Sequence, residues 1–160
     1  MSETVEISTL LERGGCYDWV AGAALADVLQ NLLSRVLLPG GLSAETVYTE
    51  LMRRETLMST ACGNGCMLLF PNTLLLDDPA QECLVVCYPK TPLDVKAFDR
   101  KPAAALFVLL VSSPERHLQA AEKLAQYMQD TAFTALLREH AAKEALCAYC
   151  KTADTAAKKN

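Results

Sequence analysis

Residues 103–128, AAALFVLLVSSPERHLQAAEKLAQYM, decide the fold class of this 160-residue chain. The stretch from Ala103 to Ser112 is a continuous apolar run, which is typical of a buried strand. Ser113-Pro114-Glu115 then predicts a helix start, because Ser can cap, Pro suits the first helical position and Glu favours the positive end of the dipole. The buried stripe of that helix continues through Leu118, Ala121, Leu124, Ala125 and Met128.

Two helices are predicted before this stretch. From Trp19 to Leu38, apolar residues recur at the i, i+3, i+4 spacing of an amphipathic helix, which Pro39-Gly40-Gly41 ends. A shorter helix is predicted from Ser43, whose hydroxyl can cap a free backbone N–H, to Arg54.

Strands and further helices complete the pattern. Apolar runs predict strands at Cys66–Phe70, after a Gly63-Asn64-Gly65 turn, and at Cys83–Tyr88. Asp130 is expected to cap a short helix, and a last helix is expected from Lys143 to Cys150. The order predicts an α/β fold with a sheet covered by helices, in one domain over residues 1–150 with a disordered polar tail at 151–160.

Composition excludes several function classes. The net charge of −4 and the lack of a Lys/Arg-rich run argue against nucleic acid binding. No apolar stretch approaches the roughly 20 residues of a membrane-spanning helix, so no membrane insertion is expected. The odd number of cysteines, seven, and an N-terminus without a signal-peptide pattern predict reduced thiols in a cytoplasmic protein.

Several short motifs follow one another along the chain. They are Arg53-Arg54-Glu55, Ser59-Thr60, Gly63-Asn64-Gly65, Thr91-Pro92, Phe98-Asp99, Leu106–Val111 and His117-Leu118. In this order and spacing the chain resembles the type-2 (fructose/mannitol) enzyme IIA domain of the bacterial phosphotransferase system, closest to its nitrogen-regulatory branch. The resemblance implies a three-layer α/β sandwich with a mixed sheet of about five strands.

The resemblance breaks at the residue that carries the family's chemistry. In the family, the strand after the Gly-x-Gly turn ends in Ile-Pro-His, and that histidine accepts a phosphoryl group; here the strand ends in Phe70-Pro71-Asn72. Asn72 stands at that position, although an ungapped alignment places Phe70 there. Phosphoryl transfer needs an imidazole lone pair, which neither side chain has.

Two neighbours of the family site are retained in the resemblance. Arg54 matches an arginine that would stabilise phosphoryl charge, and His117 matches a second histidine. All three candidate site residues have an alternative interpretation. Arg54 can be a helix-terminal cation, His117 a partly buried structural residue, and Asn72 part of an Asx-type turn after a strand.

The Cys147-x-x-Cys150 spacing, with His140 upstream, raises a zinc or redox site. No second pair accompanies it, so no metal and no cofactor is predicted. The pairs Cys62/Cys66 and Cys83/Cys87 lie in apolar surroundings, where free cysteines pack as small core residues.

Three functions follow from the resemblance. The first is a regulatory, catalytically degenerate enzyme IIA that docks on proteins, with the phosphocarrier protein, sensor kinases or potassium transport proteins as implied partners. The second is a working phosphocarrier that uses His117 or His140 as the phosphoryl acceptor. Whether the chain is an enzyme therefore stays undecided, and the missing histidine favours the answer that it is not. The third is a small-anion site between Arg54, His117 and the Gly63–Gly65 turn.

Overall fold

The computed structural model describes residues 4–57, 61–95 and 99–158. Its strands form one mixed five-stranded sheet in the order β1-β4-β5-β3-β2. β1 runs parallel to β4 and β3 parallel to β5, whereas the β2–β3 and β4–β5 pairs are antiparallel. The strands are β1 (Gly15–Val20), β2 (Ala61–Gly63), β3 (Cys66–Leu69), β4 (Cys83–Pro89) and β5 (Ala105–Leu110).

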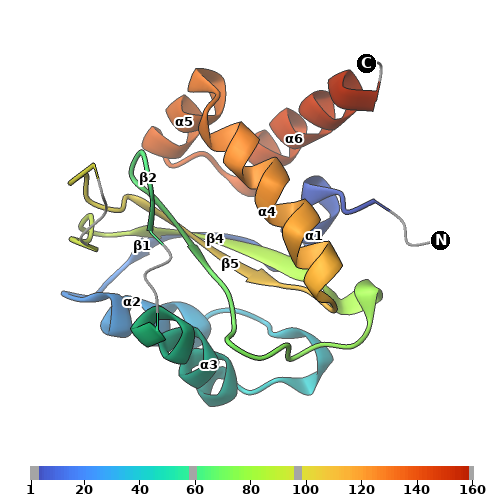
Figure 1. Cartoon of the computed structure of the whole chain (residues 1–160). Coiled ribbons are helices and arrows are strands. Elements are labelled where there is room, and N and C mark those ends of the chain that lie inside the picture. The colour runs from blue at the N-terminus through green and yellow to red at the C-terminus, as the bar shows by residue number, and fades with distance from the viewer. Residues whose placement is uncertain (1–3, 58–60, 96–98, 159–160) are drawn as a thin grey trace.

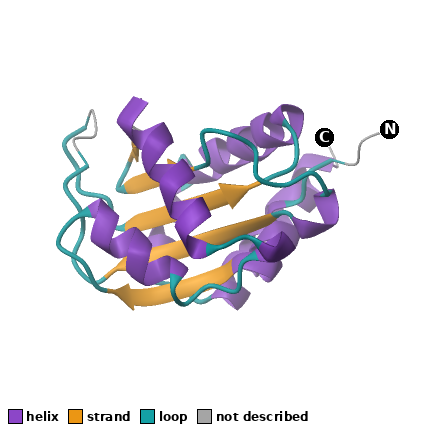
Figure 2. Ribbon diagram, turned by 90° about the horizontal axis from the view of Figure 1, so that it is seen from below, coloured by secondary structure: helices purple, strands orange, loops and turns teal. Residues whose placement is uncertain are grey.

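Helices cover both faces of this sheet. In Figure 1, α2 (Leu25–Leu33) and α3 (Ala44–Leu57) lie below it, and Figure 2 shows the molecule from that side. The upper face is covered by α1 (Ile7–Gly14), α4 (Pro114–Met128), α5 (Thr131–Arg138) and α6 (Lys143–Lys158). The predicted three-layer α/β sandwich with a mixed sheet is therefore confirmed.

β5 shows why two separate cores form. Successive strand side chains point to opposite faces, so Leu106, Val108 and Leu110 pack with α2 and α3. Phe107 and Leu109 pack with the helices of the upper face. All six residues of β5 are buried, which explains its continuous apolar sequence.

Three predicted N-caps are present. Ser43 Oγ accepts the Thr46 N–H at 3.1 Å, at the start of α3. Ser113 Oγ accepts the Arg116 N–H at 3.2 Å, and Asp130 Oδ1 accepts the Ala132 N–H at 3.0 Å. Each bond satisfies one of the backbone donors that a helix start leaves without a partner.

The helix predicted from Trp19 to Leu38 is wrong at both ends. Trp19 and Val20 belong to β1, where Val20 pairs with Pro89 of β4, and α2 occupies only Leu25–Leu33. The chain turns from β1 into α2 at Gly22, where it passes close to the backbone of α2. Only glycine fits there, because a Cβ would lie 2.6 Å from the Val28 nitrogen. Pro39–Gly41 forms a separate short 3-10 helix.

Other boundaries also differ from the sequence prediction. No helix was predicted at α1 and no strand at β1 or β2, and the strand predicted over Ala103–Ser112 is shorter, because β5 spans Ala105–Leu110. The last helix was predicted to end at Cys150, with a disordered tail after it, but α6 continues to Lys158. Tyr127 Oη donates to Asp154 Oδ1 at 2.6 Å, so this added segment contacts α4.

Within the described residues, no helix is both long and apolar enough to cross a membrane.

Candidate functional site

The first turn of α4 positions His117. Pro114 occupies the first helical position, Ser113 caps the turn, and the His117 N–H donates to the Ser113 carbonyl oxygen at 3.0 Å. β5 ends four residues before α4 begins, so the imidazole lies beside the carboxyl end of a central strand. This is the geometry that Ser113-Pro114-Glu115 predicted.

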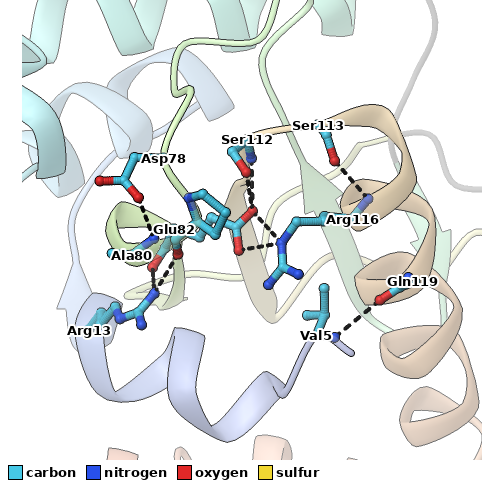
Figure 3. Close-up of polar contacts among 10 residues, drawn as sticks. Val5, Arg13, Asp78, Ala80, Glu82, Ser112, Ser113, Arg116 and Gln119 are labelled. Atoms are coloured by element: carbon cyan, nitrogen blue, oxygen red, sulfur yellow. Dashed lines mark hydrogen bonds and ion pairs between the residues drawn. The ribbon is translucent and has the colours of Figure 1, made fainter. Parts of the chain in front are cut away.

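A buried ion pair fixes that turn to the sheet. Glu82 is fully buried just before β4, and Arg116 Nε lies 2.8 Å from both of its carboxylate oxygens (Figure 3). Ser112, after β5, donates to Glu82 Oε2 from its backbone N–H at 2.9 Å and its hydroxyl at 2.8 Å. Arg13 Nη1 donates to the Glu82 carbonyl oxygen at 3.0 Å.

The Glu82 network is structural, because the side-chain oxygens of Glu82 are occupied by Arg116 and Ser112 and its carbonyl oxygen accepts from Arg13. Burial alone would raise the pKa of Glu82, but hydrogen bonds from Arg116 and Ser112 hold it below its usual range. Sequence reasoning missed this network. The only signal was an isolated acidic residue directly before an apolar strand, and such residues are usually exposed.

A pocket of about 190 Å³ lies next to His117. Its walls include Phe70, Asn72 and Leu74 after β3, together with the end of β5 and Pro114. The structure therefore brings two predicted site residues, Asn72 and His117, to one pocket. The Asn72 N–H donates to the Glu50 carbonyl oxygen at 3.2 Å, and the Thr73 N–H donates to Glu50 Oε1 at 2.9 Å. Both bonds hold this segment against α3.

Phe70 contacts two of the predicted site residues, Arg54 and His117. The Arg54 guanidinium carbon lies 4.9 Å from the centre of the Phe70 ring, and the His117 ring centre lies 4.4 Å from it at an angle of 58°. Such contacts combine a cation–π attraction with aromatic packing. An aromatic ring without a lone pair thus stands beside the imidazole and the guanidinium.

The electrostatics of this cluster favour a neutral imidazole. Burial lowers the pKa of His117, and the nearby positive charge of Arg54 lowers it further. Arg54 Nε is buried without a hydrogen-bond partner among the described residues. An unprotonated His117 beside an incompletely paired cation is an arrangement that accepts an anionic or carboxylate group.

The Gly63–Gly65 turn does not belong to this pocket. It opens β3, whereas Phe70 follows the other end of that strand. The Asn64 N–H donates to Asp99 Oδ2 at 2.8 Å, and Asn64 Nδ2 donates to the Met128 carbonyl oxygen at 3.5 Å, at the far end of α4. The prediction of a small-anion site between this turn, Arg54 and His117 is therefore wrong. Ser59-Thr60 and Phe98 of the quoted motifs lie outside the described residues.

The cysteines pack as core residues. Cys147 and Cys150 are buried, and burial raises the pKa of the Cys147 thiol to about 11 and that of Cys150 to about 12. Thiols at such pKa values are protonated at neutral pH and are poor ligands and nucleophiles. Among the described residues, no group of three His, Cys, Asp or Glu side chains is arranged to hold a metal ion. Cys66, Cys83 and Cys87 are buried as well.

The mixed sheet with α4 starting beside the ends of its central strands defines an α/β domain of the enzyme IIA class. The family described as "Phosphoenolpyruvate-dependent sugar phosphotransferase system, EIIA 2" matches residues 24–153. The chain belongs to this family, which confirms the resemblance found in its motifs.

The chain is similar to several nitrogen regulatory proteins of bacteria. It is 29% identical over 147 residues to a nitrogen regulatory protein of Pseudomonas aeruginosa, covering 89% of this chain and 92% of the relative. Nitrogen regulatory protein IIA-Ntr from Neisseria meningitidis has a similar structure, with a TM-score of 0.70 at 21% identity over 84% of this chain and 92% of the other. The Escherichia coli complex of enzyme IIAMTL with phosphorylated enzyme IIBMTL also matches, with a TM-score of 0.55 at 16% identity over 75% and 83% of the chains.

Proposed function

We propose that this chain is a regulatory protein of the nitrogen-regulatory enzyme IIA type that acts by docking on partner proteins in the cytoplasm. One observation carries the proposal: a phenyl ring, Phe70, lies in contact with Arg54 and His117. A phenyl ring cannot accept a phosphoryl group, and a carboxamide such as Asn72 is no better, because its nitrogen lone pair is delocalised. The surface around the pocket then serves recognition instead of transfer.

Exposed apolar side chains on the segments that carry Arg54, Asn72 and His117 support a protein partner. Leu118, adjacent to His117, was predicted to lie in the buried stripe of α4, but it is 59% exposed. Leu74 in the pocket wall is 44% exposed. Leu57, at the end of the helix that carries Arg54, is 67% exposed. Apolar contacts with a cation at the centre fit a partner surface that offers an apolar side chain near a carboxylate. The phosphocarrier protein, sensor kinases and potassium transport proteins are the partners to test.

Docking is tested by titrating each candidate partner from the same organism into the isotope-labelled chain and following amide shifts by NMR. We expect shifts to concentrate on residues 70–76 and on the first turn of α4. Leu118→Ser should weaken binding at least about tenfold, because it removes an exposed apolar contact beside His117. Ala125→Ser, at an exposed position further along the same helix, is the matched control. Shifts confined to the other end of the sheet would refute the proposed surface.

The neutral His117 supports a second candidate function, a phosphocarrier that uses this residue as acceptor. Its lowered pKa leaves an imidazole nitrogen unprotonated at neutral pH, as nucleophilic attack on phosphorus requires. The test is intact mass after incubation with phosphoenolpyruvate and the general phosphotransferase proteins, under conditions that preserve phosphohistidine. A gain of one phosphoryl group that His117→Ala abolishes would replace the docking proposal with this one.

A further inference from the structure

A groove of about 550 Å³ lies at the opposite end of the sheet from His117. One wall is formed by the turn before β3 and the segment that leads into β5, and the other by the end of α4 and by α5. β3 and β5 run parallel and both begin here, whereas Phe70 and His117 follow their other ends. No described residue lines both this groove and the pocket beside His117, so the two are separate sites.

The floor of the groove is apolar. Four of the residues that line it are at most 5% exposed, namely Cys66, Ala105, Met128 and Leu137. Pro102 and Ala104 add apolar surface on the side of β5. A floor of this kind favours the apolar body of a ligand, because contact with it removes apolar surface from water.

Hydrogen bonds within the chain hold the walls in place. The Gly65 carbonyl oxygen accepts the Ala104 N–H at 2.8 Å and the Ala105 N–H at 3.1 Å, which fixes the turn before β3 to the segment before β5. Asn64 Nδ2 donates to the Met128 carbonyl oxygen at 3.5 Å, which joins this turn to the end of α4. The groove therefore needs no ligand in order to form, which is usual for small-molecule sites.

Two cations lie on the exposed rim of the groove, Lys101 before β5 and Arg138 in the last turn of α5. Within the described residues, neither cation forms an ion pair, and no Asp or Glu side chain lines the groove. The rim is thus positively charged on a chain whose formal net charge is −4. A ligand with a negatively charged head group is complementary to it.

Two carboxylates are close in sequence, Asp99 and Asp130, but their oxygens accept other hydrogen bonds. Asp99 Oδ2 accepts the Asn64 N–H at 2.8 Å, and Oδ1 accepts the Lys101 N–H at 3.1 Å. Asp130 Oδ1 caps α5, and Oδ2 accepts the Tyr149 hydroxyl hydrogen at 2.6 Å. The pKa of Asp99 is lowered mainly by its backbone hydrogen bonds and less by the charge of Lys101. The Lys101 ammonium group is therefore available to a ligand.

The size of the groove and its backbone suit a small molecule. Its volume falls within the roughly 300–1,000 Å³ that is typical of small-molecule sites. An extended peptide would need a free strand edge to pair with. β3 and β5 are inner strands of the sheet and offer no such edge.

We propose that this groove binds an anionic amphiphile, a molecule with an acyl or similar apolar chain and one carboxylate or phosphate head group. The apolar chain lies on the floor formed by Met128 and Leu137, and the head group lies at the rim with Lys101 and Arg138. This binding site goes beyond the proposed docking function, because it uses no residue of the pocket beside His117.

The test titrates the full chain, isotope-labelled at its methionine methyl groups, with decanoate below its micelle concentration. We expect NMR to show one saturable site that shifts the Met128 signal and leaves that of Met52, on α3, unchanged. Decanol and decyltrimethylammonium, which lack the negative charge, should bind about tenfold more weakly. From hexanoate to decanoate, affinity should rise about two- to fourfold per methylene group. Decyl phosphate in place of decanoate distinguishes the two head groups.

Variants test the role of the rim. Lys101→Gln and Arg138→Gln should each weaken decanoate binding about two- to fivefold, as expected for exposed ion pairs. The double variant should bind decanoate about as weakly as the wild-type chain binds decanol. Lys90→Gln removes an exposed cation outside the groove and is the matched control.

Equal affinity for decanoate and decanol would overturn the proposal, because the rim charge would then have no role. The same holds for rim variants that bind decanoate as the wild-type chain does, and for shifts confined to the pocket beside His117. Any of these results would leave the docking function untouched, because docking is measured at the other end of the sheet.

Discussion

The two ends of the sheet hold one histidine each, and the two rings are held in different ways. His117 packs on a phenyl ring near a cation, and the turn that carries it is fixed by the buried Glu82–Arg116 pair. His140 is held by a carboxylate and a parallel tyrosine ring on a strained backbone. The apolar packing around His117 suits a recognition surface, whereas the half-exposed His140–Asp18 pair joins β1 to the connection between α5 and α6.

The largest effect is expected from placing an imidazole where Phe70 stands. Phe70→His would put a second imidazole in contact with His117 and near the Arg54 cation. We expect the variant to gain one phosphoryl group per chain from phosphoenolpyruvate and the general phosphotransferase proteins. Intact mass measures the gain, and tandem mass spectrometry locates it.

Phe70→Leu is the control for this substitution, because it removes the phenyl ring without adding a lone pair. A folded Phe70→His chain that stays unmodified would show that the His117 end lacks more than one side chain of a transfer site. The two ends of the sheet would then differ in the arrangement of their side chains and not only in the residue at position 70.

Breaking the buried ion pair should give the largest loss of stability. Glu82→Ala removes the carboxylate that pairs with the partly buried Arg116 and accepts from Ser112, at a cost of about 3–5 kcal/mol. Urea unfolding measures this loss, and His117 NMR signals should broaden because the first turn of α4 loses its anchor. Glu122→Gln, at an exposed position on α4, should change stability by less than about 0.5 kcal/mol.

The same network predicts a pH dependence. Because the pKa of Glu82 is lowered in the folded chain, its contribution is complete above its ordinary pKa and is lost as pH falls through the folded value. The wild-type chain should therefore lose stability in that acidic window, and Glu82→Gln should lose less. Equal acid sensitivity of the two chains would assign the effect to other carboxylates.

Local sequence signals predicted much of this architecture. The caps at Ser43, Ser113 and Asp130 and the continuous apolar strands β3, β4 and β5 were predictable, since each depends on short-range chemistry. β1 was not: its residues show mixed exposure, and the sequence around Trp19 continues the helical spacing of α2. Only pairing with β4, far along the chain, makes this segment a strand.

The site was predictable to the extent that it rests on family motifs. Motifs indicated Arg54, Asn72 and His117, and an ungapped alignment indicated Phe70 in place of Asn72, but the sequence did not decide between the two. The structure places the Phe70 ring in contact with Arg54 and His117. Neither the Glu82 network nor the Asp18–His140 pair leaves a local pattern, because its members come from distant segments. Tertiary packing alone brings them together.

A smaller effect should connect Arg54 to His117 electrostatically. Arg54→Gln removes a positive charge that lowers the pKa of His117, so this pKa should rise toward its ordinary value, while burial keeps it below. Titration of the imidazole carbon-bound protons by NMR measures the shift. The His140 signal serves as an internal control, because it lies at the other end of the sheet. An unchanged His117 pKa would mean that burial alone sets it.

The smallest stability effect is expected at the His140 end. Asn tolerates the left-handed backbone better than His does, so His140→Asn relieves strain while it loses the Asp18 pair and the Tyr88 stack. The ring and the carboxylate are 37% and 45% exposed, and such exposed pairs contribute about 1 kcal/mol or less. We therefore expect urea unfolding to change by less than about 1 kcal/mol. A loss comparable to that of Glu82→Ala would mean that His140 mainly joins β1 to the α5–α6 connection, and the two ends would then differ only in which ion pair stabilises them.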